Sequence, residues 1–321
     1  MRGGLVESVH RGRYVVCDPT GEILFSAGDA GARLFPRSAL KPLQALPLIL
    51  SGAADAFELS DDELAVACAS HYGGPRHVEA VRSLLTKAGL TESDLDNGAH
   101  PPTCGPAAEE LIRRGEKPGR IHGNCSGKHA GMLAVCRHLG WKRAGYRRPE
   151  HPVQRWTRAI ISGVSGASEQ KIRVGLDGCG APAFALPLRS LATSYARLAT
   201  GSELPVDVGT ALRRLRDAMQ NRPYLVAGAS NIDTTVMESS DLVAKRGADG
   251  VWCAGSGADG GWGLALKVSD GADRAVAPAA KALLESLGES PRLPLPPVTD
   301  LHGETAGEMV RLVPERREVG R

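Results

Sequence analysis

Apolar and polar positions alternate over short runs near both ends of this 321-residue chain. An alternation with a period of two is typical of half-buried strands. It predicts strands over residues 5–9, 13–17 and 22–26, with turn residues at 18–21 (DPTG) between the last two. Strands are also predicted over residues 171–176, 242–245, 251–255 and 263–268, of which the last three are joined by glycine-rich turns.

Between these runs, apolar residues recur at helical spacing. A helix is predicted from about residue 38 to residue 50, where Pro42 is tolerable in the first turn and Pro47 is expected to kink the helix. Ser60 and Glu63 have the spacing of a capping box and predict a helix over residues 60–69. Further helices are predicted over residues 76–88, 106–114, 128–139, 152–164, 187–199, 207–220 and 274–287.

This order of elements predicts an α+β fold. The N-terminal and C-terminal strand groups are expected to pair into one antiparallel sheet, and the central helices are expected to form a second layer. We predict a single domain over residues 1–288, with a sheet from 1–35 and 240–270 and a helical lobe over 36–240. Residues 289–321, which are rich in proline and charge, are predicted to be a C-terminal tail.

Composition excludes several classes of function. The formal net charge of +3 is small, and the basic residues are scattered, which argues against nucleic-acid binding. No apolar run approaches the roughly 18 residues of a membrane span, and the N-terminus lacks the apolar core of a signal peptide, so a cytoplasmic location is expected. Seven cysteines are an odd number without dense spacing, which indicates reduced thiols.

Lysine is scarce, with nine lysines against thirty arginines, and its positions are informative. Ser38 and Lys41 form a Ser-x-x-Lys sequence at a predicted helix start, and Lys245 lies far downstream in a Lys-x-Gly sequence on a predicted strand. One group of serine acyl-transfer enzymes builds its nucleophile and base in this way. The spacing of three residues also places Ser38 and Lys41 on the same helix face.

A lysine can activate a serine hydroxyl only while its amine is neutral. The pKa of Lys41 must therefore lie well below its ordinary value of about 10.4. Burial and a second cation, for which Lys245 is the candidate, both lower it. Ser38 could instead be a plain helix cap and Lys41 a solvated side chain, but Lys41 stands among apolar residues where an idle charge is costly.

A second group of residues suggests a metal site. Cys125 lies where a helix is predicted to begin, Lys128 follows one turn later, and Cys179 lies in a glycine-bracketed turn after a strand. Two thiols and a nitrogen could hold Zn²⁺ with a fourth position open, with His129 as the more conventional nitrogen donor. The alternative is a set of buried thiols without a metal. Residues 127–128 lack the earlier glycine of a phosphate loop, since position 122 is His122.

Five segments taken together resemble the L-asparaginase II family of the rhizobial inducible type. They are residues 36–42 (PRSALKP), 68–71 (CASH), 123–132 (GNCSGKHAGM), 177–182 (DGCGAP) and 244–251 (AKRGADGV). The resemblance extends from about residue 5 to residue 287. It implies a fold like that of serine β-lactamases and glutaminases, hydrolysis of L-asparagine to L-aspartate and ammonia, and a homodimer.

The resemblance also implies roles for particular residues. Two Ser-Lys pairs match the catalytic centre: Ser38 with Lys41, and Ser70 with Lys245. Cys125, Cys179 and Lys128 match the ligands of a zinc ion that aids substrate binding more than chemistry. Arg37 and Asp177 match positions that handle the amino-acid head group, and His71 is expected to support the substrate site.

The resulting hypothesis is a two-step acyl transfer. Ser38 attacks the side-chain amide with Lys41 as base, Ser70 relays a proton to the leaving amine, and water then hydrolyses the aspartyl ester. Asp177 is expected to pair with the substrate ammonium and Arg37 with its carboxylate. Lys267 is a competitor of Lys245 for the position beside Ser70, and Lys245 is preferred because of its Lys-x-Gly context.

Three other interpretations stay open at this point. The first is a glutaminase or another small-amide amidase of the same fold, which differs by about one methylene of pocket depth. The second is a non-enzymatic zinc-binding protein in which the serines are idle. The third makes Cys179 a thiol nucleophile with His122 or His129 as its base, although no cysteine has a recognisable nucleophile signature.

Overall fold

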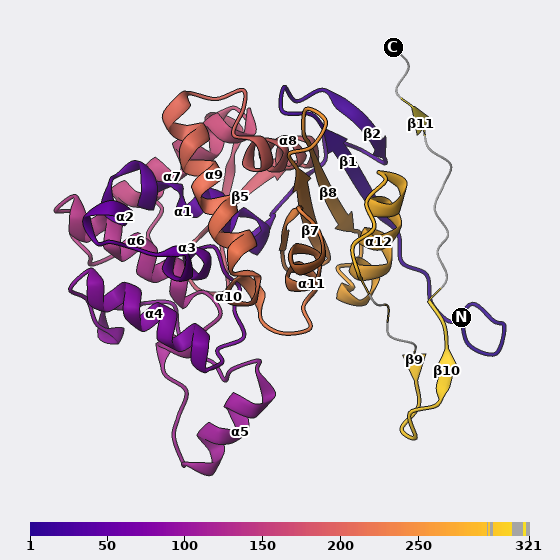
Figure 1. The fold of residues 1–321 in the computed structure, drawn as a ribbon, viewed down its shortest axis with the longest axis horizontal. Coiled ribbons are helices and arrows are strands. Elements are labelled where there is room, and N and C mark those ends of the chain that lie inside the picture. The colour runs from indigo at the N-terminus through magenta and orange to yellow at the C-terminus, as the bar shows by residue number, and fades with distance from the viewer. Residues whose placement is uncertain (294, 296–297, 310–316, 319–321) are drawn as a thin grey trace.

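The structure is a computed structural model that describes residues 1–293, 295, 298–309 and 317–318. Figure 1 shows a twisted sheet on one side of the molecule and a lobe of helices on the other. Among the described helices, none is both long and apolar enough to cross a membrane.

The main sheet joins the two ends of the chain. Its order is β11-β2-β1-β8-β7-β6, and every neighbouring pair is antiparallel. The strands are β1 (Gly12–Cys17), β2 (Ile23–Ala27), β6 (Val243–Arg246), β7 (Val251–Ser256), β8 (Trp262–Val268) and β11 (Arg317–Glu318). The predicted α+β class, with one antiparallel sheet from the N-terminal and C-terminal strands, is confirmed.

One predicted strand is wrong. Residues 5–9 form no strand beyond an isolated bridge of Leu5 with Arg2, and Leu5, Val6 and Val9 are exposed. The reason is topological: β1 already has β2 on one side and β8 on the other, so no edge next to it is free to pair with this segment.

Helices cover both faces of the main sheet. Helix α8 (Leu188–Thr200) packs on one face against β1, β7 and β8, and α12 (Val276–Ser286) packs against β7 and β8. Gly255 and Gly263 are cross-strand partners beneath α8. A Cβ on either would lie within 2.4 Å of an α8 carbonyl oxygen, so these glycines allow the helix backbone to approach the sheet closely.

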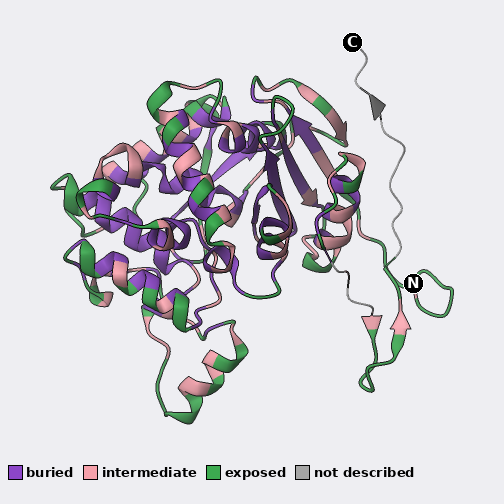
Figure 2. Ribbon diagram, viewed as in Figure 1, coloured by how far each residue is buried: buried purple, intermediate pink, exposed green. Residues whose placement is uncertain are grey.

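The helical lobe is built around α1 (Lys41–Leu50). Residues 41–48 are all buried, and α1 packs against α6, α7 and α9, as the purple centre of the lobe in Figure 2 shows. The other helices of the lobe are α2 (Ala53–Ala56), α3 (Asp61–Ala67), α4 (Pro75–Lys87), α5 (Gly105–Arg113), α6 (Ser126–His138), α7 (Pro152–Ser165), α9 (Val206–Asn221), α10 (Pro223–Ala227) and α11 (Ile232–Ser239). The capping box of Ser60 and Glu63 is confirmed at the start of α3.

A three-stranded sheet connects the lobe to the main sheet. Its order is β3 (Arg33–Leu34), β5 (Pro182–Pro187), β4 (Arg173–Leu176), all antiparallel. The sequence pattern predicted β4 but not β5. Short 3-10 helices complete the chain at η1 (Arg37–Leu40), η2 (Glu92–Asp94), η3 (Arg120–His122), η4 (Glu169–Lys171) and η5 (Asp273–Ala275).

The predicted C-terminal tail has some regular structure. Strands β9 (Val298–Thr299) and β10 (Thr305–Gly307) form a hairpin, and β11 adds to the edge of the main sheet beside β2. The remainder of the tail, at residues 294, 296–297, 310–316 and 319–321, lies outside the described residues. The division of the chain at residue 288 stays a prediction.

Candidate active site

The turn that carries Ser38 is held in an unusual backbone conformation. Arg37 has a φ of 53°, in the left-handed region that a side chain of this size rarely adopts. The turn is fixed from the sheet side by α8, where Tyr195 Oη donates to the carbonyl of Ala39 over 2.6 Å. Ser38 is half-buried, and its hydroxyl has no hydrogen-bond partner among the described residues. Strain of this kind, held by surrounding structure, is a frequent feature of functional turns.

Lys41 is the first residue of α1 and is fully buried. Its Nζ lies 2.5 Å from the carbonyl oxygen of Ala69, 3.3 Å from that of Asn124, and 2.9 Å from Ser70 Oγ. The structure therefore pairs Lys41 with Ser70, whereas the resemblance paired it with Ser38 one turn earlier. No hydrogen bond between Lys41 and Ser38 is present among the described residues.

The partners of Lys41 suit a neutral amine. Two of them are carbonyl oxygens, which can only accept, so they take two N–H bonds in either protonation state. In the neutral state the lone pair of Lys41 Nζ faces Ser70 Oγ, and the Ser70 hydroxyl becomes the donor of this hydrogen bond. Lys41 can thus accept a proton from Ser70 without rearranging its contacts.

The electrostatics of the site favour that neutral state. Burial lowers the pKa of Lys41 from its ordinary value, since no carboxylate neutralises the ammonium. The Cys125 thiolate opposes this shift, and the cations Lys128 and Lys245 reinforce it. The result is a pKa below the ordinary value, which is what a general base requires.

The loop after α3 places Ser70 beside Lys41. The backbone N–H of Ser70 donates to the carbonyl of Val226 in α10 over 2.9 Å. The next residue, His71, is fully buried: its Nδ1 accepts from the Gly73 N–H, and its Nε2 lies 2.8 Å from Ser126 Oγ. Burial holds the pKa of His71 well below its ordinary value. Both ring nitrogens are therefore engaged in fixing this loop to the start of α6.

Lys245 on β6 has a buried carboxylate as its partner. Its Nζ lies 3.1 Å from Asp233 Oδ2, and both side chains are almost completely buried. Asp233 also accepts from the Arg246 backbone N–H and from Trp252 Nε1. The Asp233 side chain therefore accepts hydrogen bonds from three N–H donors, and this network fixes the position of Lys245. The expected contact between Lys245 and Ser70 is absent among the described residues.

The competitor, Lys267, does not reach Ser70 either. Its Nζ donates instead to the backbone carbonyls of Asp249 and Val268. The choice between Lys245 and Lys267 as partner of Ser70 is thus replaced by a third pairing, Lys41 with Ser70.

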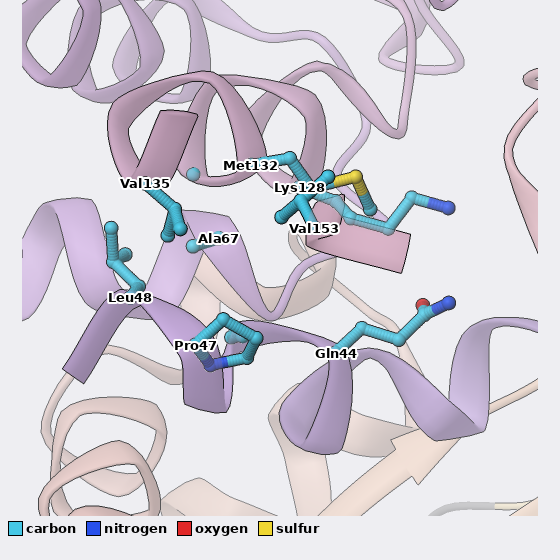
Figure 3. Close-up of a pocket in the computed structure, with 10 residues that line it drawn as sticks. Gln44, Pro47, Leu48, Ala67, Lys128, Met132, Val135 and Val153 are labelled. Atoms are coloured by element: carbon cyan, nitrogen blue, oxygen red, sulfur yellow. The ribbon is translucent and has the colours of Figure 1, made fainter. Parts of the chain in front are cut away.

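The predicted metal ligands lie together beside this network. Lys128 Nζ lies 3.2 Å from Cys179 Sγ, and the thiol of Cys179 hydrogen-bonds Cys125. A close contact brings these residues together: a Cβ on Gly127 would lie 2.0 Å from the carbonyl oxygen of Val66, so only glycine lets α6 start directly against α3. In Figure 3 the Lys128 side chain extends along a small cavity, roughly parallel to the side chain of Gln44. Its amine lies at the end of the cavity opposite to Leu48 and Val135.

The two thiols share one proton. The hydrogen bond from Cys179 lowers the pKa of Cys125 well below its ordinary value, against burial and with help from Lys41 and Lys128. The same hydrogen bond, together with burial, raises the pKa of Cys179. Burial alone would lower the pKa of Lys128, but Cys125, Cys179 and Asp177 raise it above its ordinary value. The cluster is therefore a thiolate paired with an ammonium.

This donor set fits a thiophilic metal ion. Among the described residues, no three His, Cys, Asp or Glu side chains gather in a metal-binding group, and the nitrogen beside Cys179 is the amine of Lys128. Two sulfurs and a nitrogen converge at the start of α6, where a bound cation would replace the protons now shared among them.

The residues expected to bind the amino-acid head group already pair with each other. Arg37 Nε lies 2.8 Å from Asp177 Oδ1, which also accepts from the Gly178 N–H. Lys128 Nζ lies 3.8 Å from Asp177 Oδ2. Burial alone would raise the pKa of Asp177, but Lys128 and Arg37 outweigh it and hold the pKa below its ordinary value. The carboxylate is thus ionised and ready to accept from an ammonium.

No histidine contacts Cys179 among the described residues, which removes support for the thiol-nucleophile interpretation. His129 is buried and lies 2.6 Å from the hydroxyl of Tyr146 through its Nδ1, and His122 accepts from the Gly119 N–H.

Sequence reasoning missed two carboxylates at the site, Asp233 and Asp249. Asn231 caps α11 by accepting from the Asp233 N–H, so an Asn-x-Asp pattern could have predicted the helix start. It could not have predicted that the Asp233 side chain turns inward to Lys245. Asp249 lies in the turn between β6 and β7 and binds Arg37, and nothing local indicates that contact.

Comparison with known proteins gives the family. Residues 1–309 match the family described as L-asparaginase II. The chain belongs to the L-asparaginase II family. The resemblance found in the sequence motifs is thereby confirmed. No curated protein matches the sequence.

Several solved structures are similar to the chain. One is Mglu in its L-glutamate binding form, with 14% identity and a TM-score of 0.41, covering 90% of this chain and 62% of that chain. A beta-lactamase from Mycobacterium bovis has 15% identity and a TM-score of 0.42, covering 86% of this chain and 94% of that chain. A putative beta-lactamase from Bacteroides dorei has 12% identity and a TM-score of 0.42, covering 85% and 93%. The chain spans 61–69% of the length of the Mglu chains that it matches.

Proposed function

We propose that the protein hydrolyses L-asparagine to L-aspartate and ammonia through an acyl-enzyme on Ser38. The observation that carries this proposal is the buried amine of Lys41. Lys41 follows Ser38 by three residues in the sequence, and its amine hydrogen-bonds Ser70. The family of the chain supports the reaction class. Ser38 and Ser70 are half-buried, whereas Lys41 is fully buried.

In the first step, Ser38 Oγ attacks the side-chain amide carbon and gives its proton to Lys41. Lys41, now an ammonium, donates to Ser70, and Ser70 passes a proton to the nitrogen of the leaving group. Ammonia departs, and an aspartyl ester of Ser38 is left. Water then attacks the ester with the same amine as base, which releases L-aspartate and restores the Ser38 hydroxyl.

The other charged residues have supporting roles. Arg37 would hold the α-carboxylate of the substrate and Asp177 its ammonium, since both charges need partners in a partly closed site. Lys245, which pairs with Asp233, would help to keep Lys41 neutral. A supporting role for His71 is favoured by its contacts in the Ser70 loop. The cytoplasmic location and the homodimer stay predictions.

Ammonia release tests the function and separates it from the glutaminase interpretation. We expect L-asparagine to be hydrolysed with a kcat/KM about 10- to 200-fold above that of L-glutamine, because a pocket fitted to the shorter side chain loses about 1–3 kcal/mol on one extra methylene. The measurement is ammonia formation from each amide at matched concentrations. Equal or faster hydrolysis of L-glutamine would contradict the assignment of asparagine.

Cys125, Cys179 and Lys128 would hold a zinc ion in this proposal. A bound Zn²⁺ acts as a Lewis acid and can orient a carboxylate or an amine. These residues lie beside Asp177, so their contribution would be to the binding of the substrate head group. Deprotonation of the thiols and the amine would accompany metal binding.

Metal analysis of the purified protein tests this site independently of activity. We expect about one zinc ion per chain, bound by the two sulfurs and one nitrogen. Cys125→Ser and Cys179→Ser are each expected to lose most of it, and acidification should release it because protons compete for the ligands. Cys104→Ser is the matched control, since Cys104 is a free cysteine outside this cluster. Equal zinc content in all four proteins would contradict the site.

A further inference from the structure

Two carboxylates, those of Asp177 and Asp249, hold the guanidinium of Arg37. Arg37 Nε lies 2.8 Å from Asp177 Oδ1, and Arg37 NH1 lies 3.0 Å from Asp249 Oδ2. These contacts engage Nε and Nη1 of the guanidinium and offset its charge. A substrate carboxylate that binds Arg37 therefore competes with these two carboxylates for it.

The two carboxylates differ in how firmly they are held. The Asp177 side chain is 11% exposed, and it also accepts from the Gly178 N–H and faces Lys128. The Asp249 side chain is 70% exposed, and its carboxylate bonds only Arg37 among the described residues. Releasing an exposed carboxylate into water costs little, whereas breaking a buried pair leaves an uncompensated charge. Asp249 is therefore the contact that opens.

The backbone beneath Asp249 is fixed although its carboxylate is exposed. The Gly247 N–H donates to the carbonyl of Val251, which closes the turn between β6 and β7. Lys267 Nζ donates to the carbonyl of Asp249 over 2.5 Å, and the Gly250 N–H donates to Asp273. The turn holds Asp249 within reach of Arg37, and rotation of one side chain is sufficient to break the pair.

The turn between β6 and β7 explains why an aspartate stands at position 249, but it does not explain the contact of Asp249 with Arg37. Asp249 has a φ of 56° and is followed by Gly250, and the Asp-Gly pair is a preferred sequence for two left-handed turn residues. Asparagine adopts this conformation equally well. An asparagine at position 249 therefore keeps the turn and removes only the charge, which separates the two explanations.

We propose that Asp249 is an exchangeable counter-ion of Arg37. It occupies the guanidinium while the site is empty and is displaced by the carboxylate of an α-amino-acid ligand. The inference rests on the proposed function for the class of ligand. It implies that every binding event competes with an internal carboxylate, so Asp249 weakens the affinity for substrate and product and speeds their release.

The test compares Asp249→Asn with the wild-type protein and with Asp259→Asn. Asp259 is the matched control, because it is also an exposed aspartate in the left-handed region of a hairpin turn, between β7 and β8, and has no contact with Arg37. The probe is L-aspartate, the product of the proposed reaction, and its Kd is measured by calorimetry on the full chain. KM for L-asparagine is measured in parallel.

We expect Asp249→Asn to lower the Kd for L-aspartate and the KM for L-asparagine by about 1.5- to 5-fold, the value of an exposed ion pair. Asp259→Asn should leave both constants unchanged. An unchanged or raised Kd in Asp249→Asn overturns the inference, since a structural role or a role in holding the ammonium would weaken binding.

The outcome is independent of whether the proposed reaction occurs. If Asp249→Asn binds L-aspartate more tightly but no variant releases ammonia from L-asparagine, the counter-ion role stands and the proposed function fails. If L-asparagine is hydrolysed but the wild-type protein and Asp249→Asn bind L-aspartate equally, the function stands and the counter-ion role fails.

Discussion

Replacing Ser38 with alanine is expected to lower ammonia release from L-asparagine by at least about 10⁴-fold, because no other group in the proposal forms the acyl-enzyme. The hydroxyl of Ser38 has no structural partner among the described residues, so the fold and the zinc content should not change. The measurement is kcat for ammonia release, together with the thermal unfolding temperature and metal analysis.

Two further substitutions test whether Ser38 and not Ser70 is the nucleophile. Ser70→Ala removes the proton relay and should cost about 10²- to 10⁴-fold, which is the range for general acid–base catalysis. Ser51→Ala, at the other end of α1, is the control and should retain activity. A larger loss in Ser70→Ala than in Ser38→Ala would mean that the serine already hydrogen-bonded to Lys41 is the nucleophile.

Replacing Lys41 with methionine is expected to remove the base and most of the activity, with a loss of at least about 10²-fold. In the wild-type protein, a protonated Lys41 cannot accept the proton of Ser38, so kcat/KM should fall as the pH falls through the pKa of Lys41. Burial lowers that pKa. The fall should therefore lie at lower pH than an ordinary lysine would give, and the residual activity of Lys41→Met should lack it.

The pH dependence of kcat/KM in the two proteins is the measurement, with Lys281→Met as control. Lys281 is a half-buried lysine on α12, away from the serines, and its loss should leave the pH profile unchanged. If Lys41→Met kept the wild-type profile at reduced amplitude, another group would be the base.

The sequence pattern predicted the main-sheet strands β1, β2, β6, β7 and β8 and most of the long helices, but not β11, which lies in the predicted tail. The helices could be predicted because an apolar face repeats along the chain, and β6, β7 and β8 because glycine-rich turns separate them. It missed β5, whose residues 182–187 are apolar without alternation and have a proline at each end. Five of these six residues are buried, which is typical of a strand covered on both faces, and such a run has no period from which to recognise it. It also missed the short helices α10 and α11.

The candidate site could be predicted as a set of residues but not as a set of contacts. Residues from η1, α1, α6 and the turn between β4 and β5 do lie together, as the motifs indicated. The partners differ: Lys41 bonds Ser70, and Lys245 bonds Asp233. These pairings depend on how α11 packs on β6 and how the loop after α3 meets α1, and spacing along the chain contains no information on either.

The most direct test of the central claim is to identify the residue that becomes acylated. A fluorophosphonate forms a stable ester with an activated serine, and mass spectrometry of the digested protein locates it. We predict one label per chain on Ser38 in the wild-type protein and little or none in Lys41→Met. A label on Ser70, on Cys125 or on Cys179, or undiminished labelling of Ser38 without the amine of Lys41, would contradict the account.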